Sequence, residues 1–117
     1  MSKRVLLRGF ARWLDSFTDD AVVGLSGSDT SCPVSRYIQT LGYSYVSTAG
    51  YRQYGRHKRT AGHAWQILAG SGYGCDIERL PVSPAIFRIA CMIDAVVGRW
   101  EPVTAAQARE IVQEATV

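Results

Sequence analysis

SPAIFRIACMIDAVVG, residues 83–98, is the segment with the clearest indication of how the chain folds. Ser83 followed by Pro84 is typical of the start of a helix, and Gly98 is typical of its end. Between them, apolar side chains occupy nearly all positions and would surround the helix almost completely. A helix that is apolar on all sides is normally buried. We therefore predict a central core helix over residues 84–97.

Two amphipathic helices are predicted at the ends of the chain. The N-terminal helix, residues 3–16, carries an apolar stripe at helical spacing, formed by Leu6, Phe10, Trp13, Leu14 and Phe17. Its opposite side carries Arg4, Arg8 and Arg12. The alternative is a membrane-surface or transit-type helix. Gly9 and Asp15 speak against it, so we expect the stripe to pack on the core and the arginines to face water.

The C-terminal helix, residues 104–115, begins with TAAQ. Thr104 and Gln107 have the spacing of a capping box, in which each side chain bonds the backbone of the other. The apolar stripe consists of Ala108, Ile111, Val112 and Ala115, and the residues expected to face water are Arg109, Glu110, Gln113 and Glu114. This pattern predicts a helix that covers one side of the core.

A third helix is expected over residues 33–41, after a short strand or turn at residues 21–25. Pro33 suits a first helical turn and Gly42 a C-terminal stop. The candidate caps are Asp29, Thr30 and Ser31, and the residues expected to be buried are Val34, Ile38 and Leu41. The motif predicts a short, partly buried helix.

Two strand candidates follow this helix. YSYVST, residues 43–48, alternates and is rich in Tyr, Val and Thr, which favours a strand. HAWQILA, residues 63–69, fits either a strand or a short helix. If both are strands, residues 43–69 form a hairpin or small meander with YRQYGRHKRT, residues 51–60, at its distal connection. Together the elements predict an α+β fold, with three to four helices packed on a small antiparallel sheet or hairpin in a single domain, residues 1–117.

Composition is that of a globular protein. The 117 residues are 47% hydrophobic and 20% charged, with a formal net charge of +3, which excludes a disordered chain. No apolar run reaches the roughly 18 residues of a membrane span, and no signal peptide is visible. The three cysteines are odd in number and widely spaced. Reduced thiols and a cytoplasmic location, with no membrane partner, are expected.

Two segments carry a resemblance to known proteins. SCPVSRYIQTLGYSYV, residues 31–46, and EPVTAAQAREIV, residues 101–112, resemble small uncharacterised bacterial and phage proteins. Their pattern has Ser-Cys-Pro, an Arg-Tyr pair in a short helix, an extended segment, an apolar helix and a closing Pro-Val-Thr-Ala helix. The resemblance covers residues 22–115 and implies no activity. Residues 49–62 have no counterpart in the pattern.

The basic middle of the chain is the candidate binding site. No Asp or Glu lies between Thr30 and Cys75, and the predicted binding residues are Tyr43, Tyr45, Tyr51, Arg52, Tyr54, Arg56, His57, Lys58 and Arg59. Tyrosine and arginine dominate protein-interface hot spots. The first hypothesis is a protein-binding inhibitor or adaptor of phage or mobile-element type, whose partner has an acidic or nucleic-acid-facing surface. The alternative is a nucleic-acid-binding protein in which residues 52–59 grip phosphates and tyrosines stack on bases.

Signals for chemistry are weak by comparison. Cys32 at a helix start, paired with His57 or His63, would suit a cysteine-dependent enzyme, which is the third hypothesis. Cys32, His63, Cys75 and Cys91 have irregular spacing for a metal site. The glycine-rich GSGYG, residues 70–74, lacks the Lys-Ser or Lys-Thr of a phosphate loop. The sequence therefore predicts a non-enzymatic protein with no catalytic residue, metal or cofactor.

Overall fold

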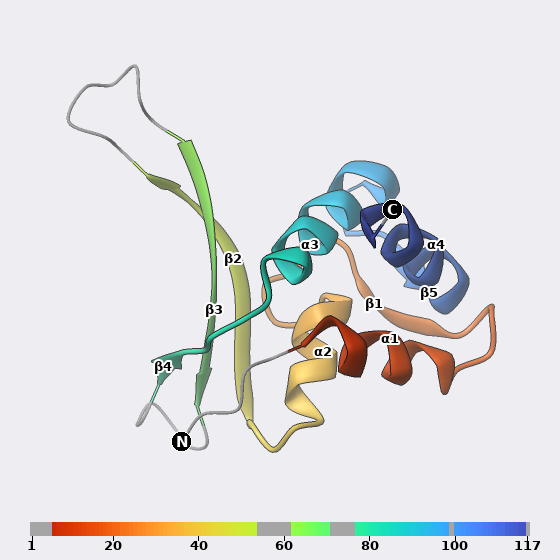
Figure 1. Ribbon diagram of the computed structural model, residues 1–117, viewed down its shortest axis with the longest axis horizontal. Helices are drawn as coiled ribbons and strands as arrows, with labels where there is room; N and C mark the ends of the chain where they lie inside the picture. Colours follow the sequence, from red (N-terminus) through yellow and green to blue (C-terminus); the bar gives the residue numbers. More distant parts are fainter. Residues whose placement is uncertain (1–5, 54–61, 71–76, 99, 117) are drawn as a thin grey trace.

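The computed structural model describes residues 6–53, 62–70, 77–98 and 100–116, and it confirms the α+β class (Figure 1). The residues predicted to form the first helical turn, and most of the basic segment, lie outside these ranges. In chain order the elements are α1 (Leu7–Asp15), β1 (Val22–Leu25), α2 (Pro33–Gln39), β2 (Tyr45–Gln53), β3 (Gly62–Gly70), β4 (Glu78–Arg79), α3 (Pro84–Val97), β5 (Pro102–Thr104) and α4 (Ala105–Thr116).

The strands form two separate antiparallel sheets. β1 pairs with β5, with Val22 opposite Thr104 and Leu25 opposite Pro102. β2, β3 and β4 form the second sheet in that order, and residues 63–69, ambiguous in the sequence, belong to strand β3. β4 and β5 are too short to leave a recognisable pattern in the sequence and were not expected. In Figure 1 the four helices lie on one side of the β2–β3 hairpin, which extends past them.

Helix α3 is the core helix, as predicted, but it is not buried all round. Ile86, Ile89, Ala90 and Ile93 line its buried face. Near its C-terminal end even the side that is buried earlier becomes open, because Val96, seven residues after Ile89, exposes 65% of its surface. The expectation of apolar burial on every side is therefore wrong at that end, because α4 and the sheets cover only part of the helix.

An aromatic cluster joins α1 to α2. Phe10 and Leu14 are fully buried, and the Tyr37 ring lies 5.7 Å from the rings of both Phe10 and Trp13. The predicted apolar stripe is thus confirmed for its central residues. Leu6 departs from it: it is the N-cap residue and half exposed, because the helix begins only at Leu7.

Gly9 marks the closest approach of α1 to this cluster. A Cβ atom at Gly9 would lie 2.1 Å from the Tyr37 hydroxyl oxygen. Alanine normally stabilises a helix relative to glycine by about 1 kcal/mol. Here we expect Gly9→Ala to lower the free energy of unfolding by about 1–2 kcal/mol, because overpacking outweighs propensity.

The matched background for this prediction is Tyr37→Phe, which removes the clashing oxygen and keeps the ring. In that background Gly9→Ala should cost little or even stabilise, so the double-mutant cycle should show strong coupling. Urea unfolding of the four proteins measures it. Equal costs of Gly9→Ala in both backgrounds would show that the hydroxyl is not the obstacle.

Helix α2 begins at Pro33, as predicted, but its capping residue and its C-terminal end differ from the prediction. Its N-cap is Cys32, whose sulfur accepts a hydrogen bond from the Ser35 backbone N–H at 3.4 Å, and not one of the three residues before it. The helix ends at Gln39, since Thr40 is the C-cap and its hydroxyl donates to the Tyr37 carbonyl. Leu41, predicted to be buried, therefore lies in the following turn and is 48% exposed.

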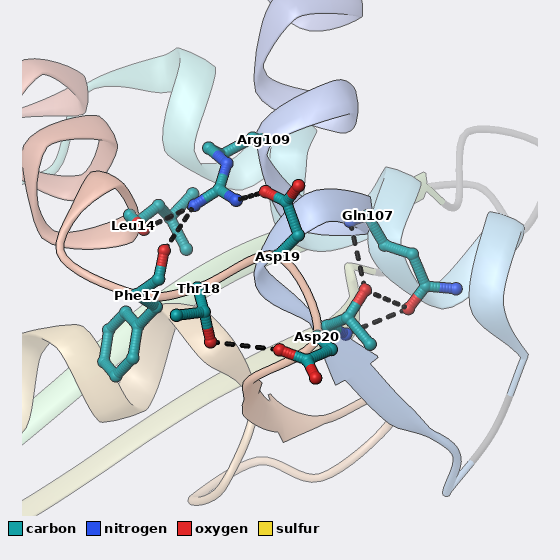
Figure 2. A network of polar contacts seen from close by, with 8 residues as sticks. Leu14, Phe17, Thr18, Asp19, Asp20, Gln107 and Arg109 are labelled. Atoms are coloured by element: carbon teal, nitrogen blue, oxygen red, sulfur yellow. Dashed lines mark hydrogen bonds and ion pairs between the residues drawn. The ribbon is translucent and has the colours of Figure 1, made fainter.

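Helix α4 begins with the predicted capping box. The Gln107 N–H donates to Thr104 Oγ1 at 3.2 Å, and the Thr104 N–H donates to Gln107 Oε1 at 2.9 Å (Figure 2). The stripe that begins at Ala108 is buried as expected. The prediction that Arg109 faces water is wrong, because its guanidinium bonds to other parts of the protein.

The Arg109 guanidinium ties α4 to the end of α1. It donates to the Leu14 carbonyl at 2.8 Å and to the Phe17 carbonyl at 3.2 Å, and it pairs with Asp19 (Figure 2). The last carbonyls of a helix lack partners within the helix. The Leu14 carbonyl already accepts from the Phe17 N–H at 3.2 Å, so Arg109 adds a further donor there and thereby fixes α1 against α4.

Candidate functional site

The β2–β3 hairpin, named the arm here, comprises Tyr45–Gln53 and Gly62–Gly70. The two strands pair without a register shift from Tyr45 opposite Gly70 to Gln53 opposite Gly62. Nine residues in a strand span about 30 Å. In Figure 1 the distal half of the arm diverges from α3 and extends beyond the helices. The predicted hairpin is therefore present, and it is a projection.

The base of the arm is anchored in the core. Its inner side contributes four buried side chains, Val46, Thr48, Ile67 and Ala69. On the outer edge of β2, the Thr48 N–H donates to the Asp29 carbonyl at 2.8 Å. On the other edge, β4 pairs with Leu68 and Ala69. These contacts hold the base in place.

The distal half of the arm has no such support within the described residues. The last backbone bond from a third segment is that of the Leu80 N–H to the Ile67 carbonyl, at 2.9 Å. Beyond the base, from the pair Gly50–Trp65 to the pair Gln53–Gly62, backbone pairing within the described residues joins β2 and β3 only. A two-stranded hairpin is at best marginally stable in water. We therefore expect this half of the arm to add little to the stability of the body.

The outer face of the arm is polar and aromatic at its base. Tyr45 is 40% exposed, and Arg79 Nη2 donates to Gln66 Oε1 at 2.9 Å across the sheet. Gln66 and Arg79 were not predicted as site residues, because the two-residue strand β4 leaves no pattern in the sequence. Together these side chains offer an exposed ring, an amide and a guanidinium.

Positive charge is concentrated in the arm and its connection. Residues 45–70 contain four of the thirteen Lys and Arg residues and none of the ten Asp and Glu residues. The remaining nine cations and ten carboxylates give the rest of the chain a formal charge of −1. All of the net positive charge of the protein therefore lies between the two ends of the arm.

The structure places the predicted binding residues unequally. Tyr43 precedes β2 and is half-buried against the core, so part of its ring is used in packing. Tyr45 is exposed at the base. Tyr51 and Arg52 belong to distal β2, where their backbones pair with Ala64 and His63. The other five, Tyr54, Arg56, His57, Lys58 and Arg59, lie outside the described residues.

The environment of Cys32 does not suit a nucleophile. The thiol is buried, and burial raises its pKa above the ordinary value, which disfavours the reactive thiolate. Its nearest polar partner is Ser35, whose hydroxyl donates to the Asp29 carbonyl at 2.6 Å and lies 2.8 Å from Thr48 Oγ1. This buried network connects α2 to the base of the arm, so its role in the fold is structural.

The raised pKa of Cys32 predicts a loss of stability in alkali. A free thiol ionises near pH 9.0, whereas the folded protein holds its proton to higher pH. Above about pH 9 the unfolded state therefore binds fewer protons, and the free energy of unfolding should fall as pH rises. Urea unfolding across this range should show a smaller fall for Cys32→Ser, which keeps a capping oxygen and does not titrate.

The control is Cys91→Ser, because Cys91 is exposed and the substitution makes the same chemical change outside the buried network of Cys32. Burial also raises the pKa of Tyr37. That group adds a further fall at higher pH, which should be the same in all three proteins. Identical pH dependence of the wild type and Cys32→Ser would contradict the assignment.

Other features offer little for ligand chemistry. A hollow of about 190 Å³ lies between α1 and α4, with Arg109 and Asp15 in its lining, which is smaller than pockets for drug-sized ligands, roughly 300–1,000 Å³. In the part of the chain that the structure describes, no group of three His, Cys, Asp or Glu residues could hold a metal ion. No helix within the same ranges is long and apolar enough to cross a bilayer.

Comparisons of the chain with protein-family models, with curated proteins and with solved structures found no match.

Proposed function

We propose that this protein is a non-enzymatic binding module of the inhibitor or adaptor type, and that the arm is its contact element. The main support for this proposal is that the distal arm projects past β4 and the helices (Figure 1). A segment that adds little to the core, yet is displayed at a distance from it, is suited to contact. Cys32 and Cys91 are free thiols, in keeping with action in the cytoplasm.

The partner that suits the arm is a protein with an acidic or nucleic-acid-facing surface. Tyrosine and arginine give large contact energies per residue at interfaces, and Tyr45 and Arg79 already display both types at the base. Opposite charge on the partner would speed association. A small protein of this kind would act by occupying such a surface, as phage or mobile-element inhibitors do.

The second candidate partner is nucleic acid, which the charge distribution favours. Residues 45–70 carry four cations and no carboxylate, and cations neutralise phosphates without reading sequence. The major groove is wide enough for a two-stranded β-ribbon. In this reading the arm lies against the phosphate backbone, and affinity falls steeply with salt.

A four-site variant tests the proposal and separates the two partners. Arg52, Arg56, Lys58 and Arg59 are changed to Gln, and the control carries the same charge change at Lys3, Arg4, Arg8 and Arg12. Each tagged protein is exposed to bacterial lysate, with and without nuclease, and to labelled single-stranded and duplex oligonucleotides at two salt concentrations. The arm variant should lose its partner, and the control should retain it.

The result also identifies the partner class. Retention of a protein after nuclease treatment supports the inhibitor or adaptor, whereas salt-sensitive binding of oligonucleotides supports the phosphate grip. Equal retention by the wild type and the arm variant, in every format, would exclude the arm cations as the contact element.

A further inference from the structure

Trp100 is the most exposed large apolar side chain among the described residues, and its backbone is strained. It exposes 67% of its surface, and its φ angle is 60°. A bulky residue seldom adopts positive φ, and such outliers gather at functional positions. Both the exposed indole and the positive φ cost stability. The contacts of the surrounding residues must therefore impose this conformation on Trp100.

Ser26 fixes the turn at Trp100 and Glu101 through hydrogen bonds. The Trp100 N–H donates to the Ser26 carbonyl at 2.8 Å, and the Ser26 N–H donates to the Glu101 carbonyl at 2.9 Å. The Glu101 N–H donates to Ser26 Oγ at 3.1 Å, and Ser26 is fully buried. The turn is thus fixed before any partner arrives, which lowers the entropic cost of binding.

Negative charge gathers beside the same turn. The Asp94 carboxylate accepts from the Gly27 N–H at 2.8 Å, so Asp94 and the Trp100 turn are anchored on two consecutive residues. Asp94 lies in the last turn of α3, where no basic residue offsets the negative end of the helix dipole. Glu101 is exposed. With Arg99, whose placement lies outside the described residues, residues 94–101 carry a net charge of −1.

Trp100 is next to Glu101 in the sequence, and the Asp94 carboxylate is bound to Gly27, the residue after Ser26. An exposed indole on such an acidic segment is suited to a cation. Arginine binds the face of tryptophan through cation–π attraction and pairs with carboxylates at the same time. Val96, four residues earlier in the sequence, is also 65% exposed and is a second exposed apolar side chain near the end of α3. The expected occupant is therefore a cationic segment that also carries aromatic or aliphatic groups.

We propose that this surface, Trp100 with Asp94 and Glu101, binds the arm of a second copy of the chain. Charge complementarity supports this occupant, because residues 45–70 carry +4 and the remainder of each chain carries −1. The arm of the same chain diverges from α3 (Figure 1), so the contact is between copies. Exchange of both arms gives a closed two-fold dimer. The inference rests on the proposed function, since it uses the arm as the contact element.

Sedimentation velocity over a wide concentration range tests the dimer with two variants. Trp100→Gly removes the ring and relieves the positive φ, so it should fold at least as well as the wild type. The four-site arm variant removes the cations. Each should raise the dimer dissociation constant at least about tenfold, whereas Val22→Ser, which changes another exposed apolar residue, should leave it unchanged.

An equimolar mixture of the two variants tests the dimer most specifically. Trp100→Gly has an intact arm and the arm variant an intact Trp100 surface, so an equimolar mixture should dimerise more strongly than either variant alone. A monomeric wild type, a dimer that survives either variant, or a mixture no better than its components would each overturn the inference.

The same proteins separate this inference from the proposed function. Trp100→Gly keeps its arm and should still retain an oligonucleotide or lysate protein that the wild type retains. A wild-type dimer that binds neither probe would refute the proposed function and leave the inference standing. A monomeric wild type that binds a probe through its arm would refute the inference and leave the proposed function standing.

Discussion

Replacing Gly24 with alanine is expected to cost about 3 kcal/mol of unfolding free energy. A Cβ atom at Gly24 would lie 2.6 Å from Pro33 N, 2.7 Å from the Ser31 carbonyl oxygen and 2.8 Å from the Cys32 carbonyl carbon. All three are backbone atoms at the start of α2, so no side-chain rotation can make room.

The segment that Gly24 faces is itself fixed. The Leu25 N–H donates to the Ser31 carbonyl at 2.9 Å, and the Cys32 N–H donates to the Ser28 carbonyl at 3.1 Å. Alanine would therefore have to separate β1 from α2. Thermal and urea unfolding measure the loss, with Val22→Ala as the control, because half-exposed Val22 in the same strand should change stability by less than about 0.5 kcal/mol. A similarly small effect of Gly24→Ala would show that the two elements are not in close contact.

Replacing Arg109 with methionine is expected to cost about 2 kcal/mol. Methionine keeps the aliphatic part of the side chain but removes the bonds to the Leu14 and Phe17 carbonyls, and hydrogen bonds from charged donors contribute about 1.5–3 kcal/mol. Asp19, by contrast, has a side chain that is 86% exposed, and exposed ion pairs contribute little.

Asp19→Asn is therefore the informative companion to Arg109→Met. We expect it to cost less than about 0.5 kcal/mol in urea unfolding. If the two substitutions proved equally costly, the ion pair and not the carbonyl bonds would join α4 to α1.

The elements that the sequence predicted well depend on short-range signals. Thr104 and Gln107 are three residues apart, Pro84 marks the start of α3 by itself, and the alternation in β2 repeats every two residues. Each signal is complete within one element, so its physical cause can be read without knowing the fold. The α+β class follows from these elements together.

The features that the sequence did not reveal depend on partners far along the chain. β5 exists because Pro102 pairs with Leu25, and Arg109 is engaged because α1 ends beside it. Trp100 is displayed because Ser26, 74 positions earlier in the sequence, binds its turn. No local pattern encodes such pairings.

In the candidate site, too, some features follow from local sequence patterns and others from contacts that are distant in the sequence. Alternation and charge placed a basic hairpin in the middle of the chain, and the structure describes that hairpin as a projecting arm. The depth to which its base is anchored, through Thr48 and Ser35, and the use of Tyr43 in packing follow from contacts with α2. The sequence could not supply them.

If the arm is a contact element that is separable from the body, a shortened arm should fold normally and lose the partner. Tyr51 and Ala64 are opposite each other, so an Asn-Gly turn between them can replace residues 52–63 as a two-residue hairpin loop. The measurement is retention of the wild-type partner, whether lysate protein or oligonucleotide, by this variant after its unfolding transition has been verified. We predict an unfolding free energy within about 1 kcal/mol of the wild type and at least about a tenfold loss of binding. Undiminished retention by the shortened variant would show that the arm is not the contact element. A body that no longer folds would show that the arm is not separable from it.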